Sequence, residues 1–228
     1  LRRHKRLKED FARRLVPDDW LTAERHVAAG ASVPGPNSVK DRPLRIWVQA
    51  ASGGEAWLVH SLAPALAEAL AAHPTLSARP LELLCTTWTR QGLDILEKLP
   101  APARASAPVS ILPRYFPLDR PDLMRRAIDA AKPDAVALLE TELWPGLLAA
   151  AAEKGIPILA LNARMTEKSF KAYGKAGFFW RDHAPERILA ISPEDADRFA
   201  RLFGCPERVE LMPNIKFDRV AESPGCPA

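Results

Sequence analysis

Short apolar runs alternate with helix-patterned segments along most of this chain. Seven runs have the length and composition of strands, at 44–50, 81–87, 109–112, 135–139, 156–161, 187–192 and 209–212. Helices are expected between them, over 55–71, 89–98, 120–131, 143–153, 166–175 and 193–203. Apolar runs without polar alternation are typical of parallel strands buried on both faces, and hairpin signals are missing. The pattern predicts one Rossmann-like, mostly parallel α/β sheet with helices on both faces.

Some helix ends carry their own signals. Asp119 is a candidate N-cap for the helix at 120–131. Pro145 fits the first turn of the helix at 143–153, and Gly155 follows its end. The strands before and after that helix complete a βαβ unit of about thirty residues. A right-handed crossover places the carboxyl end of its first strand where open α/β sheets bind ligands.

The two ends of the chain differ from its middle. Residues 1–29 place apolar positions among many basic ones, which predicts a basic amphipathic helix that breaks at Pro17 and lies close to a membrane. Such a start is typical of the cytoplasmic flank of a membrane anchor, although a solvated basic helix explains it equally well. Residues 30–218 form the predicted Rossmann-like domain, and residues 219–228 begin a linker. No apolar run approaches the roughly 18 residues of a spanning helix.

Composition narrows the function classes only slightly. The net charge of +4 is modest, and we expect no nucleic-acid partner. Cys85, Cys205 and Cys226 are an odd number without metal-ligand spacing, which favours a reducing compartment over a disulfide framework. The five histidines are scattered as well, so the sequence predicts no metal site.

Charged side chains follow several of the predicted strands directly. They are Glu55, Glu140, Glu142, Arg164 and Lys216. Because parallel strands end at the same edge of a sheet, we expect these side chains to gather in one crevice. Their convergence tells more about function than any one of them does.

The turn Ser52-Gly53-Gly54-Glu55 separates the first strand from its helix. In one interpretation the glycines let a ligand approach the backbone, and Glu55 acts as a general base if burial raises its pKa. In the other, Ser52 and Glu55 form a capping box that only satisfies the helix N-terminus, and spacing alone favours this somewhat. The turn lacks the G-x-G-x-x-G pattern of dinucleotide sites, which argues against an unrelated nucleotide-binding protein.

Other strand ends allow a functional and a structural interpretation too. Thr87 has a hydroxyl that can meet phosphate or sugar, but capping the next helix is favoured. Asn162 follows the fifth predicted strand, and Arg164 beside it can pair with phosphate or carboxylate, or be an ordinary surface arginine. Glu142 precedes the helix at 143–153, where it favours the helix dipole.

Several motifs together are similar to one family. They are ETELWP at 140–145, NAR at 162–164, SPEDADRF at 192–199 and N-x-KFD at 214–218, with SGGE at 52–55, TTWTRQG at 86–92 and YFPLD at 115–119 upstream. In this order, over about residues 8–218, they resemble the transferases of 3-deoxy-D-manno-octulosonic acid (Kdo). The combination is highly specific and covers nearly the whole chain.

The resemblance implies the amino-terminal, acceptor-binding half of a two-domain GT-B glycosyltransferase of lipopolysaccharide biosynthesis. Such an enzyme transfers Kdo from CMP-Kdo to the lipid A precursor lipid IVA, a tetraacyl disaccharide bisphosphate, with inversion and without a metal or other cofactor. It works at the cytoplasmic face of the inner membrane, as a peripheral protein or with a single N-terminal anchor outside this chain. The donor-binding half is expected outside these 228 residues, either in a longer protein of which this chain is a part or in a second chain.

Residue roles follow from the same resemblance. Glu55 matches the family's catalytic base, and Glu140 and Lys216 match its transition-state stabilisers. The acceptor is expected to meet the residues around them, which are Ser52, Gly53, Gly54, Thr87, Glu142, Asn162 and Arg164.

Four positions depart from the family pattern. Gln49 stands in place of its histidine, Gly53 of its valine, Gly146 of its asparagine and Pro213 of its glycine. These departures concern the shape of the acceptor site. The alternative function is a non-catalytic, lipid-binding, membrane-peripheral module that kept the fold.

Overall fold

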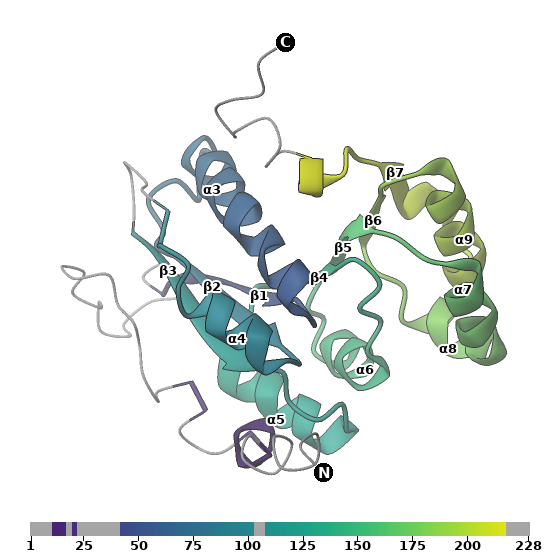
Figure 1. Cartoon of the computed structure of the whole chain (residues 1–228), viewed down its shortest axis with the longest axis horizontal. Coiled ribbons are helices and arrows are strands. Elements are labelled where there is room, and N and C mark those ends of the chain that lie inside the picture. Colours follow the sequence, from purple (N-terminus) through teal and green to yellow (C-terminus); the bar gives the residue numbers. More distant parts are fainter. Residues whose placement is uncertain (1–10, 17–19, 22–41, 103–107, 218–228) are drawn as a thin grey trace.

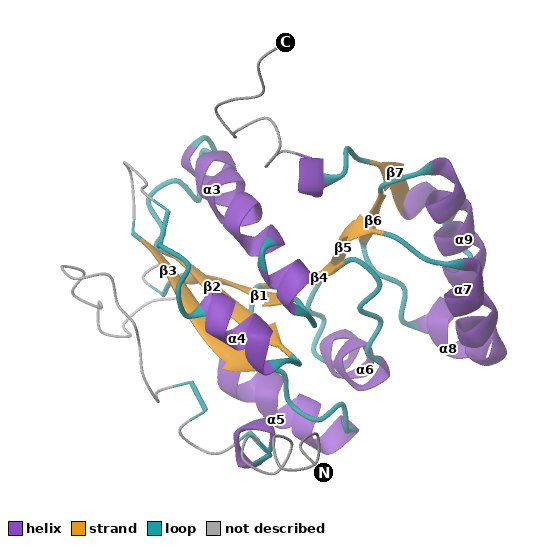
Figure 2. Cartoon of the chain, viewed as in Figure 1, coloured by secondary structure: helices purple, strands orange, loops and turns teal. Residues whose placement is uncertain are grey.

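Seven parallel strands form one sheet in the computed structural model, which describes residues 11–16, 20–21, 42–102 and 108–217. The strands run in the order β3-β2-β1-β4-β5-β6-β7, and every neighbouring pair is parallel. Their bounds are β1 Leu44–Gln49, β2 Leu81–Thr87, β3 Val109–Tyr115, β4 Ala135–Leu139, β5 Ile158–Ala163, β6 Arg187–Ala190 and β7 Val209–Leu211. The predicted Rossmann-like α/β fold is confirmed (Figures 1 and 2).

Helices connect the strands and cover both faces of the sheet. The α-helices are α2 Gly53–Ala56, α3 Leu58–Ala71, α4 Arg90–Leu96, α5 Pro121–Ala131, α6 Pro145–Glu153, α7 Glu167–Tyr173, α8 Gly177–Asp182 and α9 Pro193–Phe203. Short 3-10 turns are η1 Ala12–Arg14, η2 Gly174–Ala176, η3 Pro206–Arg208 and η4 Ile215–Phe217. Helices α3 and α4 lie on one face, and α5, α6, α8 and α9 contribute to the core on the other.

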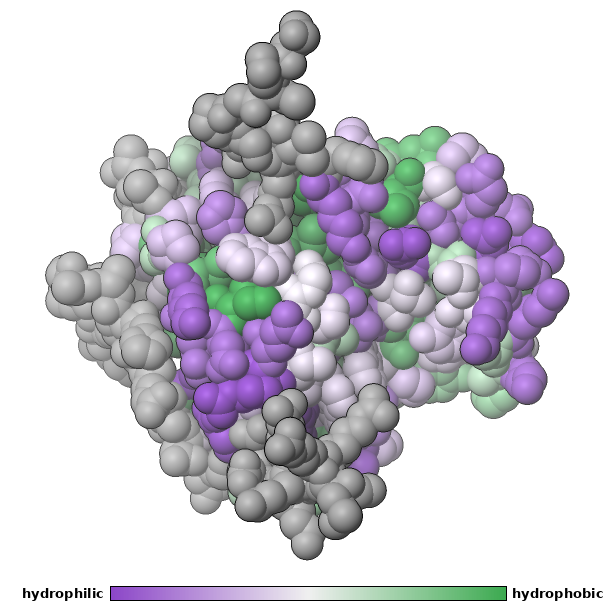
Figure 3. Space-filling view, in the orientation of Figure 1, coloured by the Kyte–Doolittle hydropathy of each residue, from purple (hydrophilic) through white to green (hydrophobic). Residues whose placement is uncertain are grey.

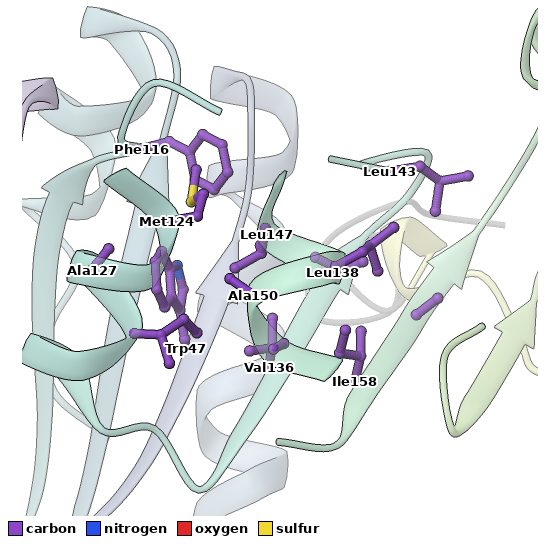
Figure 4. Close-up of a cluster of buried hydrophobic side chains, with 14 of the residues drawn as sticks. Trp47, Phe116, Met124, Ala127, Val136, Leu138, Leu143, Leu147, Ala150 and Ile158 are labelled. Carbon is purple, nitrogen blue, oxygen red and sulfur yellow. The ribbon is translucent and has the colours of Figure 1, made fainter. Parts of the chain in front are cut away.

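Successive strand residues alternate between the two cores, as the pleat requires. Trp47 joins the core under α5 and α6, whereas Val48 joins the core under α3. Val136 and Ala137 divide in the same way on β4. Figure 4 shows the larger of the two clusters, in which Trp47 packs among side chains from β4, α5 and α6. Burial on both faces explains why these strands read as continuous apolar runs.

The first described segment packs against the carboxyl edge of the sheet. The Arg14 guanidinium donates to the carbonyl oxygens of Phe116, at 3.2 Å, and Trp88, at 2.6 Å. Trp20 stacks obliquely on Trp47, with 5.6 Å between ring centroids. Of the amphipathic helix predicted for residues 1–29, the described part contains only the η1 turn, and most of that prediction lies outside the described residues. The linker prediction for 219–228 lies outside them too.

The expected helix at 55–71 and strand at 109–112 need correction. The helix begins two residues earlier and is divided at Trp57 into α2 and α3. Strand β3 continues through Pro113 to Tyr115. It tolerates a proline because it is an edge strand, where one side of the backbone needs no partner.

The prediction of Asp119 as the cap of the next helix is wrong. Arg120 is the N-cap of α5, without a side-chain hydrogen bond. The Asp119 carboxylate instead accepts from the backbone N–H groups of Gly146 and Leu147, both at 3.0 Å. It therefore caps α6, a helix that supplies no side-chain cap of its own.

Candidate active site

The candidate site lies where the sheet changes its direction of winding. Strands β1 and β4 are neighbours, with β2 and β3 continuing on one side and β5, β6 and β7 on the other. Connections leaving β1 and β4 therefore diverge, and a crevice opens outside their carboxyl ends. Glu55 follows β1, and Glu140 and Glu142 follow β4. The register aligns Gln49, the last residue of β1, with Leu138 of β4. The strand ends that the sequence indicated as the candidate site therefore coincide with this switch point, and the binding of a ligand there stays a prediction.

Glu55 is held by the turn that it caps. Its Oε2 accepts from the backbone N–H of Ala51 at 2.5 Å and of Ser52 at 3.2 Å. Ser52 Oγ accepts in return from the N–H of Glu55 at 3.4 Å, which completes the capping box. The structural interpretation of this motif is confirmed. Because the carboxyl group remains at the crevice, the same geometry also fixes its position for chemistry.

The surroundings of Glu55 favour its protonated form. Burial raises the pKa of this carboxyl most, and the negative charge of Glu140 raises it further. Hydrogen bonds from Ala51 and Ser52 act in the opposite direction and lower the pKa. The net pKa lies above the ordinary value of 4.5. A carboxylate with a raised pKa is a stronger base, which is the direction that general-base catalysis needs.

Glu140 forms an ion pair with Lys216. Its backbone has a φ of 59°, and this left-handed turn ends β4. The Glu140 Oε1 contacts Nζ of Lys216, with the carboxylate side chain 13% exposed and the lysine 42% exposed. Two residues from remote parts of the chain thus meet at the crevice, as expected from their places after β4 and β7.

Asn162 holds the turn that carries Lys216. Its Oδ1 accepts from the backbone N–H of Ile215 at 3.0 Å, and its side chain is fully buried. Asn162 has a φ of 53°, a conformation that asparagine tolerates better than most residues. This residue ties η4 to the end of β5, and so acts on the position of Lys216.

Glu142 has the least expected environment of the three glutamates. Its Oε2 accepts from Nε1 of Trp144 at 2.6 Å. Burial, followed by the charge of Glu55, raises its pKa from 4.5 to about 7, although hydrogen bonding to Trp144 and to Gln49 lowers it. Asp119 accepts from the N–H groups of Gly146 and Leu147 at the start of α6, whereas Glu142 accepts from the side chain of Trp144, the N-cap of that helix. A favourable interaction of Glu142 with the dipole of α6 stays a prediction.

The residues expected to meet an acceptor are placed differently from one another. Gly54 and Arg164 are exposed, and Ser52 and Glu142 are partly exposed. Gly53, Thr87 and Asn162 are buried, and Thr87 Oγ1 donates to the carbonyl oxygen of Ala51 at 3.2 Å. In this structure Thr87 and Asn162 are buried and hydrogen-bond to the backbone of segments next to the crevice. Contact of either residue with an acceptor stays a prediction.

An aromatic wall stands beside Glu142, and sequence reasoning missed it. Trp88 stacks on Trp144 with ring centroids 5.6 Å apart, and Phe116 lies 4.8 Å from Trp144. The Arg14 guanidinium covers Trp88 at 4.4 Å. These residues follow β2, β3 and β4, so the rule that located the charged residues could have located them as well.

A family model described as 3-deoxy-D-manno-octulosonic-acid transferase (kdotransferase) matches residues 10–219. This chain belongs to that Kdo transferase family. It is 30% identical to the 3-deoxy-D-manno-octulosonic acid transferase of Haemophilus influenzae, covering 77% of this chain and 38% of that protein. It is 31% identical to the 3-deoxy-D-manno-octulosonic acid transferase of Bordetella pertussis, over 83% of this chain and 40% of that protein.

A plant protein is similar too. A probable mitochondrial 3-deoxy-D-manno-octulosonic acid transferase of Arabidopsis thaliana is 33% identical over 60% of this chain and 28% of its own length. The chain thus spans well under half the length of these relatives. Its seven-stranded Rossmann-like sheet is consistent with the amino-terminal domain of a GT-B glycosyltransferase.

Two of the departures from the Kdo transferase pattern have a local structural reason. A Cβ at Gly146 would lie 2.6 Å from Oδ1 of Asp119, so glycine allows Asp119 to cap α6. A Cβ at Gly53 would lie 3.0 Å from Cδ of Gln91, whose side chain occupies that space. Nothing in the structure explains proline at position 213.

Two features that the described residues lack are a cluster of metal-binding side chains and a helix that could span a membrane. Within the described ranges, no three His, Cys, Asp or Glu side chains are arranged to hold a metal ion. None of the described helices has the length and apolar character needed to cross a membrane. The space-filling view shows a largely hydrophilic surface over α7 and α9 (Figure 3).

Proposed function

We propose that the protein carrying this chain transfers Kdo from CMP-Kdo to lipid IVA in lipopolysaccharide biosynthesis, and that this chain forms the acceptor-binding half. One observation carries the proposal. In a member of the Kdo transferase family, Glu55 lies at the switch point with a raised pKa, beside the Glu140–Lys216 pair. The donor would be held mainly by a second domain, as the GT-B resemblance implies.

The proposed chemistry assigns one task to each charged group. A hydroxyl oxygen of the acceptor attacks the anomeric carbon of Kdo while the bond to the CMP phosphate breaks. Glu55 takes the hydroxyl proton, and CMP leaves with the bonding electrons. The Glu140 carboxylate stabilises positive charge on the sugar, and Lys216 offsets negative charge on the departing phosphate.

The acceptor would lie over the exposed part of the crevice. Gly54 permits close approach, since a Cβ there would meet only Ser52 Oγ, at 3.8 Å. Arg164 is exposed and suited to a phosphate of the disaccharide. A lipid acceptor implies contact with the cytoplasmic face of the inner membrane, and the basic residues 1–29 have the composition for that.

The test replaces Glu55 by Gln in the protein that carries this chain together with its donor domain. Removing a general base lowers kcat by about 10²–10⁴-fold. CMP release and acceptor glycosylation are measured, together with acceptor binding and the thermal unfolding midpoint. Glu68→Gln, on the exposed face of α3, is the matched control. Wild-type turnover in Glu55→Gln would refute the proposal.

A second function has one observation in its favour. The Glu55 carboxylate already accepts two backbone N–H groups, which is a complete structural role. A lipid-binding, membrane-peripheral module without catalysis would need nothing more. Binding of lipid IVA without CMP release, with the donor domain present, would support this alternative.

A further inference from the structure

Arginine side chains fasten the N-terminal segment to the sheet. This segment comprises residues 11–16 and 20–21. Arg114, on β3, donates to the carbonyl oxygens of Trp20 at 2.6 Å and Leu21 at 3.2 Å. Arg126, on α5, donates to the carbonyl oxygen of Val16 at 2.8 Å, and Figure 1 shows the purple η1 turn beside that helix. Because the Val16 and Trp20 side chains are also buried in the core, the segment has a fixed place on the β3 side of the sheet.

Arg14 extends from this segment into the aromatic wall. Its Cζ lies 4.4 Å from the ring centroid of Trp88 and 4.4 Å from that of Tyr115. The same guanidinium donates to the carbonyl oxygens of Trp88 at 2.6 Å and Phe116 at 3.2 Å, and the residue is only 5% exposed. A planar guanidinium suits such a place, because it stacks on rings and donates in its own plane. Contact of a cation with an aromatic face is also stronger when water is excluded. Arg14 therefore holds both the ring and the backbone of Trp88.

The aromatic wall connects Arg14 with the crevice. Trp88 stacks on Trp144, with an interplanar angle of 26°, and Phe116 contacts Trp144 from another direction. Trp144 Nε1 donates to Oε2 of Glu142 at 2.6 Å, and Glu142 is partly exposed at the crevice. The plane of the Trp144 ring thus decides where this hydrogen bond points.

We propose that Arg14 is a positioning residue of the candidate site, which holds the aromatic wall in place so that Trp144 keeps the Glu142 carboxyl group at the crevice. Arg14 acts through these rings rather than by contacting the substrate. The N-terminal segment is then a working part of the site, although it lies far from Glu142 in the sequence. The inference deepens the proposed function, in which Glu142 meets the acceptor, and rests on it for its effect on activity.

The chain offers a matched control in the neighbouring arginine. Arg13 lies on the same η1 turn, carries the same charge and is exposed. Its described ring contact is with Tyr115, at 5.1 Å, and not with a ring of the aromatic wall. Arg13→Leu therefore removes one positive charge from the segment and leaves the contacts of Arg14 with Trp88 intact.

The decisive experiment follows the indole N–H of Trp144 by NMR in the full chain. Labelling the six tryptophans with ¹⁵N gives one side-chain signal for each indole, and Trp144→Phe assigns the signal of interest by its loss. Its exchange with water is measured in wild type, Arg14→Leu and Arg13→Leu. The Trp180 indole, which donates to the carbonyl oxygen of Tyr173 at 2.8 Å, is an internal reference.

In Arg14→Leu the Trp144 indole proton should exchange about tenfold faster, because the wall has lost a desolvated cation that covers Trp88. Exchange at Trp180 should stay unchanged, and Arg13→Leu should match the wild type at both indoles. An unchanged Trp144 rate in a folded Arg14→Leu would overturn the inference. So would equal acceleration in Arg13→Leu, or equal acceleration at Trp180, since either shows a general loosening of the fold.

A second variant covers the case in which Arg14→Leu does not fold. Trp88→Leu removes the ring between Arg14 and Trp144, and Trp88 is partly exposed, so the change leaves most of the core alone. It should accelerate exchange of the Trp144 indole to a similar extent. Wild-type exchange in Trp88→Leu would overturn the inference as well.

Activity gives a further readout in the protein with its donor domain. Arg14→Leu should raise KM for the acceptor by about three- to tenfold, as expected for a weakened hydrogen bond to substrate, and should leave KM for CMP-Kdo unchanged. A merely structural Arg14 would lower the folded fraction, and so kcat, with both KM values unchanged; that result would overturn the inference. Absence of Kdo transfer in the wild type would refute the proposed function, and the exchange rates would still decide whether Arg14 positions Trp144.

Discussion

Replacing Glu142 by Gln should stabilise the fold at neutral and alkaline pH. The folded chain keeps the Glu142 carboxyl in a site that resists ionisation, whereas the unfolded chain exposes it to water. In the wild type, Nε1 of Trp144 lies 2.6 Å from Oε2 of Glu142. Glutamine has nearly the same shape as glutamate and still offers an oxygen to that N–H. The substitution therefore removes the unfavourable charge and keeps the principal hydrogen bond.

The magnitude follows from the two pKa values of Glu142. Burial and the charge of Glu55 raise the pKa from 4.5 in the unfolded chain to about 7 in the fold. Between these values the folded state binds more protons than the unfolded state, so the free energy of unfolding decreases as pH rises. Each pH unit is worth about 1.4 kcal/mol, and the full interval amounts to about 3 kcal/mol. Below pH 4.5 both states are protonated and the contribution disappears.

The assay is denaturant unfolding of wild type and Glu142→Gln from pH 4 to pH 8.5. The difference in free energy of unfolding should be small at pH 4, grow through pH 5–7 and level off at about 3 kcal/mol in favour of the variant. Glu68→Gln, which changes an exposed glutamate, should show a difference that does not depend on pH. A flat difference for Glu142→Gln, or a variant less stable at pH 8, would refute the reasoning.

Three other substitutions test contacts that support the site. Asp119→Ala should lower the free energy of unfolding by about 1 kcal/mol, because α6 loses its cap, and denaturant unfolding measures this. Gly146→Ala should lower it by about 1–3 kcal/mol, and less so when Asp119 is already alanine, since the clash is with that carboxylate; additive losses would contradict this. Asn162→Ala leaves the N–H of Ile215 without its acceptor, so hydrogen exchange at 215–216 should accelerate while exchange in α9 stays unchanged.

The apolar pattern predicted the sheet because burial on both faces leaves a simple signal. All seven strands were located, and the strand at 135–139 had the observed bounds. The pattern missed α8, Gly177–Asp182, because two glycines and a 3-10 turn interrupt the periodicity between α7 and α8. The cap of α6 was unpredictable for a different reason. Asp119 is 26 residues upstream of Pro145, where that helix begins, and local rules assign a cap only to the helix that follows it.

The candidate site was predictable as a set of strand ends but not as a set of contacts. Position after a strand indicated that Glu55, Glu140 and Lys216 would share one crevice, and the pairing of Lys216 with Glu140 agrees with that. The same rule could not distinguish Glu140 from Glu142. The two glutamates differ in their neighbours. Glu140 pairs with Lys216 of η4, whereas Glu142 lies beside Trp144 and the buried Gln49.

Two residues near the ends of adjacent strands share an unusual backbone conformation, and both act on where the charges lie. Glu140 directly follows β4 and Asn162 is one residue before the end of β5; their φ values are 59° and 53°, and the Glu140 N–H donates to the carbonyl oxygen of Leu161 at 3.0 Å. Non-glycine residues adopt this region at some cost in free energy, and such residues cluster at functional sites. Here the turn at Glu140 directs one carboxylate to Lys216, and the turn at Asn162 holds the segment that carries this lysine. The contacts that place the ion pair therefore involve two residues with positive φ, a backbone feature that residue type alone does not reveal.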